Sequence, residues 1–407
     1  MYFREKGLFF LLLRKKRLSL HNKYYIMKIL FLTYHGFNPG SGISKKMLAQ
    51  IKGLEQNGHE LHVCSYTVEP NGDKCRYIDN TIVQNFGNSK WASIKHRYDF
   101  NCVIKYCRDN KIDLVYARSY MNASPGVIHF FKELNRNSIK SVIEIPTYPY
   151  DHELSMLPFE HKIRLLIDKI FRKKLAKQTN AIVTFSDEKQ IFGQRTINIS
   201  NGIDLNTIPL HKEVDYSKEI HIIAVAEVHP WHGYDRFIEG LGIYYKKNKD
   251  KKYPVYFHIV GDVWDSEMYG TKHAPGFATL IKKYDIEQFV VFHGKLFGEE
   301  LNKVFDICSF AVGSLARHRS GITSIKTLKN REYACRGIPF IYSEQDSDFE
   351  EQPYVIKASA DESPIDIFRI IKFMELFSLK PKDIRNTVEH LSWKIQMKLV
   401  IESISKL

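Results

Sequence analysis

Short apolar runs alternate with amphipathic helical stretches along this chain, and this alternation constrains the fold more than any other feature. In the first half the runs have the length of strands and are bounded by polar residues, glycine or proline. They are Met27–Thr33, Glu60–Tyr66, Asp113–Ala117, Ser141–Ile145, Ala181–Phe185 and Ile197–Ser200. Continuous apolar strands between helices are typical of a parallel sheet covered on both faces. The first half therefore predicts an α/β domain with a doubly wound parallel sheet.

The alternation starts again after a polar loop around Asn206–Ser217. The further apolar runs are His221–Ala226, Val255–Val260, Phe289–His293, Ile307–Val312 and Ile338–Tyr342. Two such series predict two Rossmann-like domains that face each other across a cleft. Ligands of doubly wound sheets bind beyond the carboxyl ends of the strands, so the residues that follow each run are the candidates for function.

Helical periodicity between the runs predicts the helices that cover the sheets. The helices that matter below are expected over His161–Lys177, Tyr234–Tyr245 and Ser324–Arg336. The first is amphipathic and basic, and its expected inward residues are Ile163, Leu166, Ile167, Ile170 and Leu175. Its lysines and arginines form either a solvated face or a surface that rests on a membrane.

Charge and cysteine content narrow the class of partner and the compartment. The formal net charge is +14, and residues 1–26 supply +6 of it, with seven lysines and arginines against Glu5. A basic body fits anionic partners such as nucleotide phosphates or an anionic membrane. The six cysteines show no CxxC pair and no zinc-like spacing, which indicates free thiols in a reducing cytoplasm.

The N-terminal segment 1–26 is expected to lie outside the folded protein, which begins at Met27. Its apolar run Leu8–Leu13 is too short to span a bilayer, and no small-residue cleavage site follows it. We therefore expect an extension that is disordered or not native to the protein. A short basic and apolar anchor on a membrane surface is the alternative.

Two glycine-containing turns lie at positions where a ligand or a hinge is expected. The loop Asn38–Gly42 joins the first predicted strand to a helix, where glycines let the backbone approach a ligand and the helix N-terminus offers N–H groups to an anion. The turn Asn201–Asp204 lies just before the second series. A plain tight turn is the alternative explanation of either motif.

The strand ends of the second series carry cationic and histidine-rich loops. Trp231–Arg236 follows the first of these strands, and Gly261 follows the second. The loop Arg317–Arg319 precedes a helix with Lys329 and Glu332 three residues apart on one face. A cationic loop before a helix N-terminus suits a phosphate group, whereas a solvated basic loop is the alternative.

In this order the motifs resemble those of glycosyltransferase family 4, a branch of the GT-B fold. The resemblance covers about Met27 to Leu407 and includes the first glycine loop, the NGID turn, the VGD strand end and the helix with E-x4-G-x-P. Ser392-Trp393 opens a last helix of the kind that crosses back to the first domain in that fold. The implied parts are the extension 1–26, an acceptor-side domain 27–206, a nucleotide-sugar domain 207–378 and C-terminal helices 379–407 that pack on the first domain.

The resemblance also implies roles for individual residues. Glu332 matches a glutamate that contacts the donor ribose, and Gly42 matches the loop that faces the donor diphosphate. Lys329 matches a lysine that some branches place before this glutamate. Asn201 and Asp204 match the element that shapes the hinge between the domains.

Several positions depart from the family pattern. Ser324 stands where the first motif glutamate is expected, while Glu227 and His232 stand where an arginine and a lysine neutralise the donor diphosphate. The segment Ile145–Tyr150 occupies the place of the usual histidine. The neighbours expected to compensate for the missing positive charge are His229, Arg236, Arg317, His318 and Arg319.

The implied reaction moves a sugar from a nucleotide-sugar donor to a glycan or lipid-linked acceptor, with retention at the anomeric carbon. The residues expected to stabilise the departing nucleoside diphosphate are His232, Arg317 and Arg319, with no metal and no cofactor besides the nucleotide-sugar co-substrate. The expected donor-binding residues are Gly42, Glu332, Lys329, His318, His229 and Gly261.

Other functions remain open on the sequence. The departures at Glu227 and Ser324 suit a catalytically weak nucleotide-sugar-binding protein, and a sugar-nucleotide epimerase shares the fold. The expected role is surface polysaccharide or glycoconjugate synthesis in the cytoplasm, either free or in peripheral contact with the inner face of an anionic membrane. A nucleic acid partner is not expected, because the basic residues are dispersed and no stacking motif is present.

Overall fold

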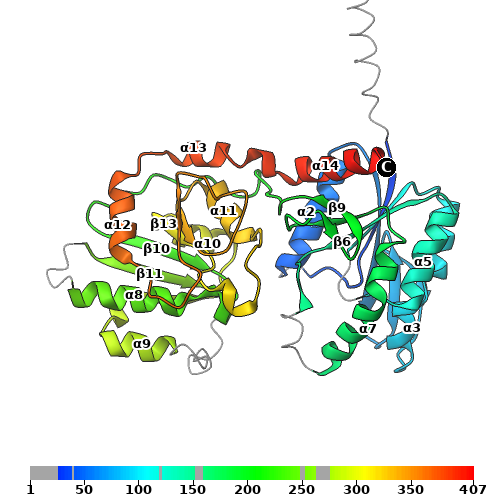
Figure 1. Cartoon of the computed structure of the whole chain (residues 1–407), viewed down its shortest axis with the longest axis horizontal. Helices are drawn as coiled ribbons and strands as arrows, with labels where there is room; N and C mark the ends of the chain where they lie inside the picture. The colour runs from blue at the N-terminus through cyan, green and yellow to red at the C-terminus, as the bar shows by residue number, and fades with distance from the viewer. Residues whose placement is uncertain (1–25, 39–40, 119–121, 152–158, 248–252, 263–275) are drawn as a thin grey trace, which may run out of the picture.

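The computed structural model describes residues 26–38, 41–118, 122–151, 159–247, 253–262 and 276–407. Almost all of the N-terminal extension, and Pro39 and Gly40 of the first glycine loop, lie outside the described residues. Two sheets are present, and each lies at the centre of its own half of the chain (Figure 1). The predicted pair of Rossmann-like units facing each other is confirmed.

The first sheet has strand order β4-β3-β2-β1-β5-β6-β7-β9-β8. Its parallel strands are β1 (Lys28–Leu32), β2 (Glu60–Val68), β5 (Leu114–Arg118), β6 (Lys140–Ile145), β7 (Ala181–Thr184) and β9 (Gln194–Asn198). The antiparallel strands at its edges are β3 (Lys74–Ile78), β4 (Thr81–Asn85) and β8 (Gln190–Ile191). The parallel centre was predicted, whereas the β3–β4 hairpin was not.

The second sheet is parallel throughout and has strand order β12-β11-β10-β13-β14-β15. Its strands are β10 (Ile220–Val225), β11 (Val255–Val260), β12 (Val290–Gly294), β13 (Phe310–Val312), β14 (Phe340–Tyr342) and β15 (Val355–Lys357). The strand order reverses direction next to β10, and an α/β sheet binds ligands beside such a reversal.

The helices cover both faces of each sheet. Those of the first half are α2 (Gly42–Glu55), α3 (Ala92–Tyr98), α4 (Asn101–Asp109), α5 (Pro125–Arg136) and α7 (Phe159–Ala176). Those of the second half are α8 (Tyr234–Lys247), α9 (Phe277–Tyr284), α10 (Gly298–Phe305), α11 (Leu328–Arg336), α12 (Ile367–Leu376), α13 (Pro381–Asn386) and α14 (Trp393–Ser405).

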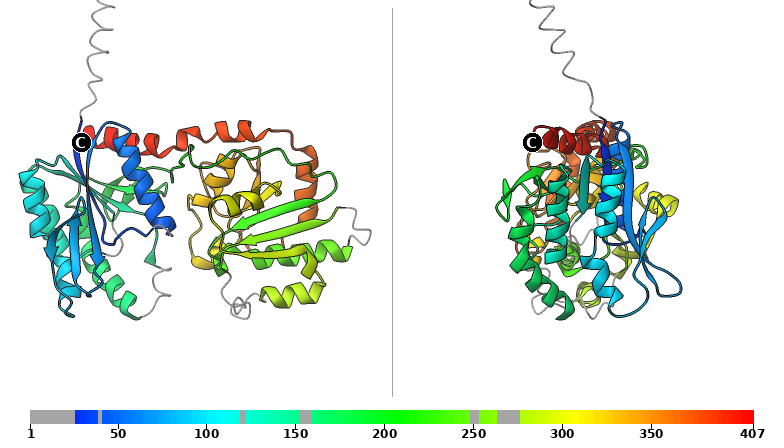
Figure 2. Two further views of the ribbon diagram at one scale, coloured as in Figure 1. Left: turned by 180° about the vertical axis from the view of Figure 1, so that it is seen from behind. Right: turned by 90° about the vertical axis from the view of Figure 1, so that its right-hand side faces the viewer.

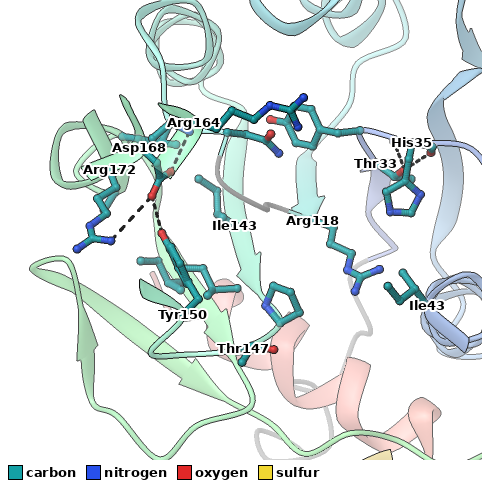
Figure 3. A pocket seen from close by; sticks show the side chains of 18 of the residues that line it. Thr33, His35, Ile43, Arg118, Ile143, Thr147, Tyr150, Arg164, Asp168 and Arg172 are labelled. Atoms are coloured by element: carbon teal, nitrogen blue, oxygen red, sulfur yellow. Dashed lines mark hydrogen bonds and ion pairs between the residues drawn. The ribbon is translucent and has the colours of Figure 1, made fainter. Parts of the chain in front are cut away.

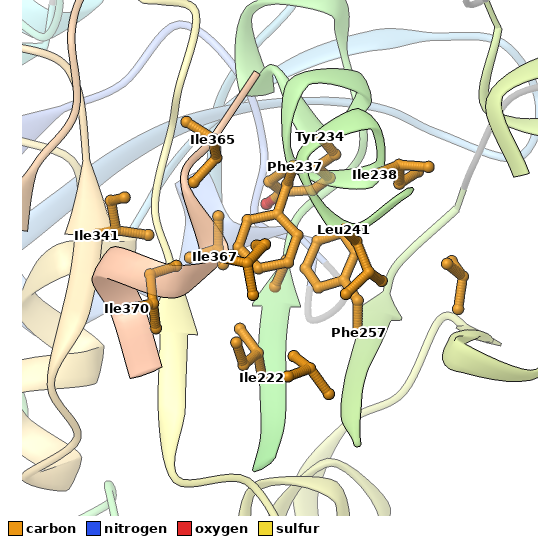
Figure 4. Packing of buried hydrophobic residues seen from close by; sticks show 14 of the residues in the cluster. Ile222, Tyr234, Phe237, Ile238, Leu241, Phe257, Ile341, Ile365, Ile367 and Ile370 are labelled. Carbon is orange, nitrogen blue, oxygen red and sulfur yellow. The ribbon is translucent and has the colours of Figure 1, made fainter. Parts of the chain in front are cut away.

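Side-chain alternation along the strands explains why both faces are covered. Along β1, Leu30 packs with the α5 side of the sheet, while Phe31 packs with α2 and α14. In the second half, Phe237 of α8 packs on Phe257 of β11 with ring centroids 4.2 Å apart, and Ile367 of α12 completes this cluster (Figure 4). Burial of such continuous apolar surface is the main favourable term in folding.

Helix α14 returns to the first half, as the predicted fold class requires. It crosses α2 near the C-terminal end of that helix and ends over the first sheet, where the C-terminus lies (Figures 1 and 2). Gly53 lies directly under the Trp393 backbone, and Gly202 lies under its indole ring, where a Cβ atom would come within 2.2 Å of the ring. The close approach at both glycines fixes where α14 crosses.

Two predicted elements are shorter than expected. The helix predicted over Ser324–Arg336 begins at Leu328, because the preceding residues are extended and Ser324 forms a β-bridge with Gln345. The strand predicted over Ile307–Val312 covers Phe310–Val312.

The inward face predicted for the basic helix is wrong at three positions of α7. Ile163, Leu166 and Ile170 are 45%, 61% and 58% exposed, whereas Leu165 and Asp168 are buried. The Asp168 carboxylate accepts hydrogen bonds from the Tyr150 hydroxyl and the Ala123 amide, which holds this polar position against the protein. Among the helices described, none has both the length and the apolar character needed to cross a bilayer.

Candidate functional site

The carboxyl ends of β10 and β13 carry two short 3-10 turns that pack together. The first spans Pro230–His232 and the second spans Arg317–Ser320. Gly233 lies between them with a positive φ of 64°, and a Cβ atom there would lie 2.8 Å from Ala316. Glycine is therefore required at this crossing, and the turns hold their histidines and arginines at the edge of the sheet.

His232 is buried at this edge and is neutral among its protein neighbours. Burial lowers its pKa well below the usual value, and Lys329, Arg317 and His229 lower it further. Its Nδ1 accepts a hydrogen bond of 2.9 Å from the His229 amide, so its Nε2 carries the proton. His232 can therefore donate a hydrogen bond without bringing a charge, unlike the lysine expected at this position.

Arg317, Lys329 and Glu344 form a cationic cluster at the start of α11. Burial and the charge of Arg317 together lower the pKa of Lys329 to about 7, and Glu344 opposes this shift. Burial also raises the pKa of Glu344, which accepts a hydrogen bond from the Asn330 amide at 3.2 Å. Two cations thus share one buried carboxylate beside the N–H groups that open α11, an arrangement that suits a phosphate.

Arg319 and His318 belong to an adjoining network of ion pairs. The Arg319 guanidinium lies 2.7 Å from Asp235 and also binds both oxygens of Glu362, while His318 lies 2.7 Å from Glu362. Arg319 and His318 hold the pKa of Glu362 at about 2. Arg236 pairs with Asp361 in the same region. Arg319 and His318 therefore both have carboxylate partners within the protein, and the pair of Arg319 with Asp235 joins the second turn to α8.

Two other predicted donor residues, Gly261 and Glu332, lie in the second half. Gly261 follows β11 with a φ of +131°, and a Cβ atom there would lie 1.7 Å from the Ala226 carbonyl oxygen. Glu332 lies on α11, where it accepts hydrogen bonds of 3.0 and 2.9 Å from the Arg336 guanidinium. Glycine is therefore required at position 261 so that the backbone can pass close to Ala226. The Glu332 carboxylate is partly exposed.

The predicted hinge residues lie where the two halves meet. The Asn201 side-chain amide donates a hydrogen bond to the Lys326 carbonyl, which connects the turn to the segment before α11. Asp204 lies 3.3 Å from Lys52 of α2, at a partly exposed ion pair. The preceding Ser200 contacts Arg331, whose buried guanidinium donates a hydrogen bond of 2.7 Å to the Ser200 hydroxyl.

A cavity of about 650 Å³ opens at the carboxyl ends of the strands of the first sheet. Gly42, Asn201 and Leu328 line it together, so it adjoins both halves of the chain. Figure 3 shows that Tyr150 and Asp168 lie on one side and Ile43 lies opposite. Gly42 has no neighbour within 4 Å of an added Cβ, so its position leaves space for a ligand.

A buried polar cluster that the sequence analysis missed lies behind the cavity wall, and its members Lys46 and Arg118 line the cavity. Glu144 is fully buried and accepts hydrogen bonds from Gln50 and from the Tyr116 hydroxyl, at 2.6 and 2.5 Å. Lys46 and Arg118 lie 3.8 and 3.5 Å from the same carboxylate. A glutamate in the apolar run Ser141–Ile145 was the one signal in the sequence, because a buried carboxylate requires partners.

The structure brings together some of the predicted site residues and separates others. His229, His232, Arg317 and Lys329 meet at the edge of the second sheet, and the pairs of His318 and Arg319 adjoin them. Gly42 and Asn201 belong to the cavity of the first sheet instead. Among the described residues, no group of histidines, cysteines and acids is arranged to hold a metal ion.

No family model and no curated protein matches this sequence. Solved structures match it over nearly its whole length. HepE of Anabaena, in complex with UDP and glucose, is 15% identical, with 94% of this chain and 100% of HepE covered and a TM-score of 0.56. The catalytic domain of starch synthase IV from Arabidopsis thaliana, bound to ADP and acarbose, is 9% identical, with 94% and 99% covered and a TM-score of 0.59. Trehalose-6-phosphate synthase OtsA is 11% identical, with 94% and 99% covered and a TM-score of 0.56. The chain has the GT-B fold that these structures share.

Proposed function

We propose that this protein is a glycosyltransferase that moves a sugar from a nucleotide-sugar donor to a glycan or lipid-linked acceptor. The observation that carries the proposal is the position of Arg317 and Lys329 beside the N-terminus of α11, at the carboxyl edge of the second sheet. The shared fold supports it, since HepE was solved with UDP-glucose and starch synthase IV with ADP.

The proposed reaction breaks the bond between the anomeric carbon and the diphosphate oxygen. A new bond forms between that carbon and the acceptor oxygen on the same face of the sugar, and the acceptor proton passes to the departing phosphate. Arg317, Lys329 and the first N–H groups of α11 stabilise the charge that develops on this phosphate, and His232 donates a hydrogen bond through Nε2. These protein cations do the work for which a metal ion is often used, so the proposed reaction is metal-independent.

A screen of nucleotide sugars by thermal shift, followed by an assay of nucleoside diphosphate release, tests the proposal. A donor that binds only the folded protein raises the melting temperature. Lys329→Met and Arg317→Met should each weaken donor binding by about tenfold or more, since each removes a charge-assisted contact. The matched control is Lys282→Met on α9, an exposed lysine away from the cluster.

The outcomes separate this proposal from its alternatives. Donor binding without turnover, with any acceptor, would favour the weak binding protein suggested by Glu227 and Ser324. Conversion of one sugar nucleotide to another would favour an epimerase. Arg319→Met should also lower turnover, but its ion pairs require a check of the melting temperature, because lost stability alone lowers activity.

We also propose that α7 rests on an anionic membrane and so presents a lipid-linked acceptor to the cavity. The exposed residues Ile163, Leu166 and Ile170 follow helical spacing and form an apolar stripe. Exposed lysines flank this stripe: Lys162, Lys169, Lys173 and Lys174. An apolar face bordered by cations is the pattern of a helix that lies in a membrane interface.

Sedimentation with vesicles tests the membrane contact. The protein should bind phosphatidylglycerol vesicles more tightly than phosphatidylcholine vesicles, and salt should weaken that binding. Leu166→Gln combined with Ile170→Gln should abolish it, whereas Ile307→Gln, at an exposed isoleucine of the second half, should not. Equal vesicle binding by the α7 double variant and by Ile307→Gln would show that the apolar stripe of α7 does not make the membrane contact.

A further inference from the structure

Arg118 brings an incompletely paired guanidinium into the cavity of the first half. It ends strand β5, and Figure 3 shows it extending into the space between Ile43 and Thr147. Its side chain is 10% exposed, and its Nη1 is buried with no hydrogen-bond partner among the described residues. A buried guanidinium nitrogen without a partner loses the hydrogen bonds that water gave it, so this position favours a ligand that accepts one.

The charges around Arg118 do not balance. Its nearest carboxylate is Glu144, 3.5 Å from Nε, but that carboxylate also faces Lys46 at 3.8 Å. Lys46 is buried as well, with its Nζ 3.3 Å from the centre of the Phe185 ring. Two buried basic side chains therefore share one buried anion. Burial lowers the pKa of Lys46 to about 7, so the positive excess is present below that pH and declines as Lys46 loses its proton above it.

The other acid in the lining does not correct this excess. Asp168 is buried, and its oxygens are occupied by the Tyr150 hydroxyl at 2.7 Å and the Ala123 amide at 3.2 Å, with Arg172 at 4.0 Å. Arg164 adds a further cation to the lining. The remaining walls are largely apolar and include Ile143, Ile145, Leu175 and Phe192, which suits the carbon face of a sugar ring.

We propose that this cavity takes an acceptor that carries an anionic group, a carboxylate or a phosphate, and that Arg118 binds that group. The inference rests on the proposed function and deepens it, because it names the acceptor class. A carboxylate or phosphate can accept two parallel hydrogen bonds from a guanidinium, so it would pair with the part of the Arg118 side chain that lines the cavity and balance the excess charge. A neutral sugar can accept a hydrogen bond from the guanidinium but cannot balance its charge.

Calorimetry with three probes tests the acceptor class: glucuronate, glucose 6-phosphate and glucose, each added to the protein saturated with UDP. We expect the two anionic probes to bind at least about tenfold more tightly than glucose. Tight binding of glucuronate alone would identify the anion as a sugar carboxylate, and tight binding of glucose 6-phosphate alone would identify it as a phosphate. Equal binding of all three would overturn the inference.

Substitutions test whether Arg118 causes the preference for anionic probes. Arg118→Gln should remove the preference for anionic probes, and Arg118→Lys should restore part of it because the charge returns without the guanidinium fork. Arg164→Gln should reduce the preference without unsettling the Glu144 cluster, which it does not join. The matched control is Arg195→Gln, an exposed arginine on β9 outside the cavity. An unchanged preference in Arg118→Gln would refute the assignment.

The same titrations, repeated on the protein without UDP, separate this inference from the proposed function on which it rests. If UDP and the nucleotide sugars fail to bind at all, the proposed glycosyltransferase function fails. If UDP binds and the anionic probes do not, only the acceptor inference fails. If UDP and the anionic probes exclude each other, Arg118 binds the donor phosphates, and the inference fails in favour of a donor site that extends into the first half.

Discussion

Lys329 takes up a proton when a diphosphate binds above about pH 7, and this uptake affects both stability and binding. Burial lowers its pKa to about 7. Between that value and the ordinary lysine pKa of about 10.4, the unfolded chain binds more protons than the folded chain. The contribution of Lys329 to the free energy of unfolding therefore rises with pH across this window. A bound phosphate raises the pKa of Lys329 again, because it stabilises the charged ammonium form.

We predict that the affinity for UDP-glucose falls as pH rises above about 7, by up to about tenfold per pH unit. The neighbours that face Lys329 are Arg317, Glu344, His229 and His232. Burial keeps both histidines neutral across this range and Arg317 keeps its charge, so Lys329 dominates the dependence. Burial raises the pKa of Glu344, and loss of its proton with rising pH would lower the affinity in the same direction. Calorimetry on both sides of neutrality measures the slope. Lys329→Met should flatten it, and an equal slope in that variant would contradict the assignment.

Residues within one stretch of sequence were predictable, and residues joined only by the fold were not. Arg317 and Lys329 lie near each other along the chain and next to a predicted helix start, so a phosphate site could be inferred there. Arg118 and Lys46 come from different elements, and their common partner Glu144 comes from a third. Nothing in the sequence shows that Arg118 and Lys46 share one carboxylate. Judged from the sequence alone, each would be expected to be a solvated side chain.

At the scale of elements, periodicity located α7 but not its buried face. Apolar residues occur on two sides of this helix, and the structure buries Leu165 with the polar Asp168 rather than the stripe through Leu166. A hydrophobic pattern assumes that apolar side chains face inward, whereas hydrogen bonds from Tyr150 and Ala123 hold Asp168 inside. The β3–β4 hairpin was missed because its strands, KCRYI and TIVQN, mix polar and apolar residues and form no continuous apolar run.

We predict that neighbouring leucines of α7 differ sharply in their contribution to stability. Leu165→Ala should lower the free energy of unfolding by about 2–5 kcal/mol, because it removes a buried side chain and leaves a cavity. Leu166→Ala should change it by less than about 0.5 kcal/mol, because this side chain is exposed. Equilibrium denaturation with guanidinium measures both values. Equal losses would mean that the stripe is buried in solution.

At the scale of the whole molecule, the two halves are joined by two crossing segments. Ile203 and Ser392 form a parallel β-bridge, so the linker to the second half runs beside the segment that returns as α14. The Gln396 side chain accepts a hydrogen bond of 2.8 Å from the Ser200 amide and so ties the two segments together. The return of the last helix was predictable from the resemblance at Ser392-Trp393, but the ionic contacts at the crossing were not.

Arg331 connects this crossing to the second sheet. Its guanidinium binds both oxygens of Asp346, at 2.7 and 2.9 Å, and also contacts Asp348 and the Ser200 hydroxyl. Arg331 and Asp346 are both 1% exposed. Loss of one partner of a buried ion pair costs more than the pair contributes, because the remaining charge stays in a medium of low dielectric constant.

We predict that Arg331→Met lowers the free energy of unfolding by about 3–5 kcal/mol, because it leaves the buried Asp346 carboxylate without its ion-pair partner. Since the lost contacts include Ser200 of the linker, the variant should also unfold in two calorimetric transitions, one for each half, where the parent protein unfolds in one. Arg136→Met on α5 is the control, because its side chain is 70% exposed and its pair with Glu133 should contribute about 1 kcal/mol or less. Similar losses in the two variants would show that the crossing is held by apolar packing around Trp393 and not by this ionic network.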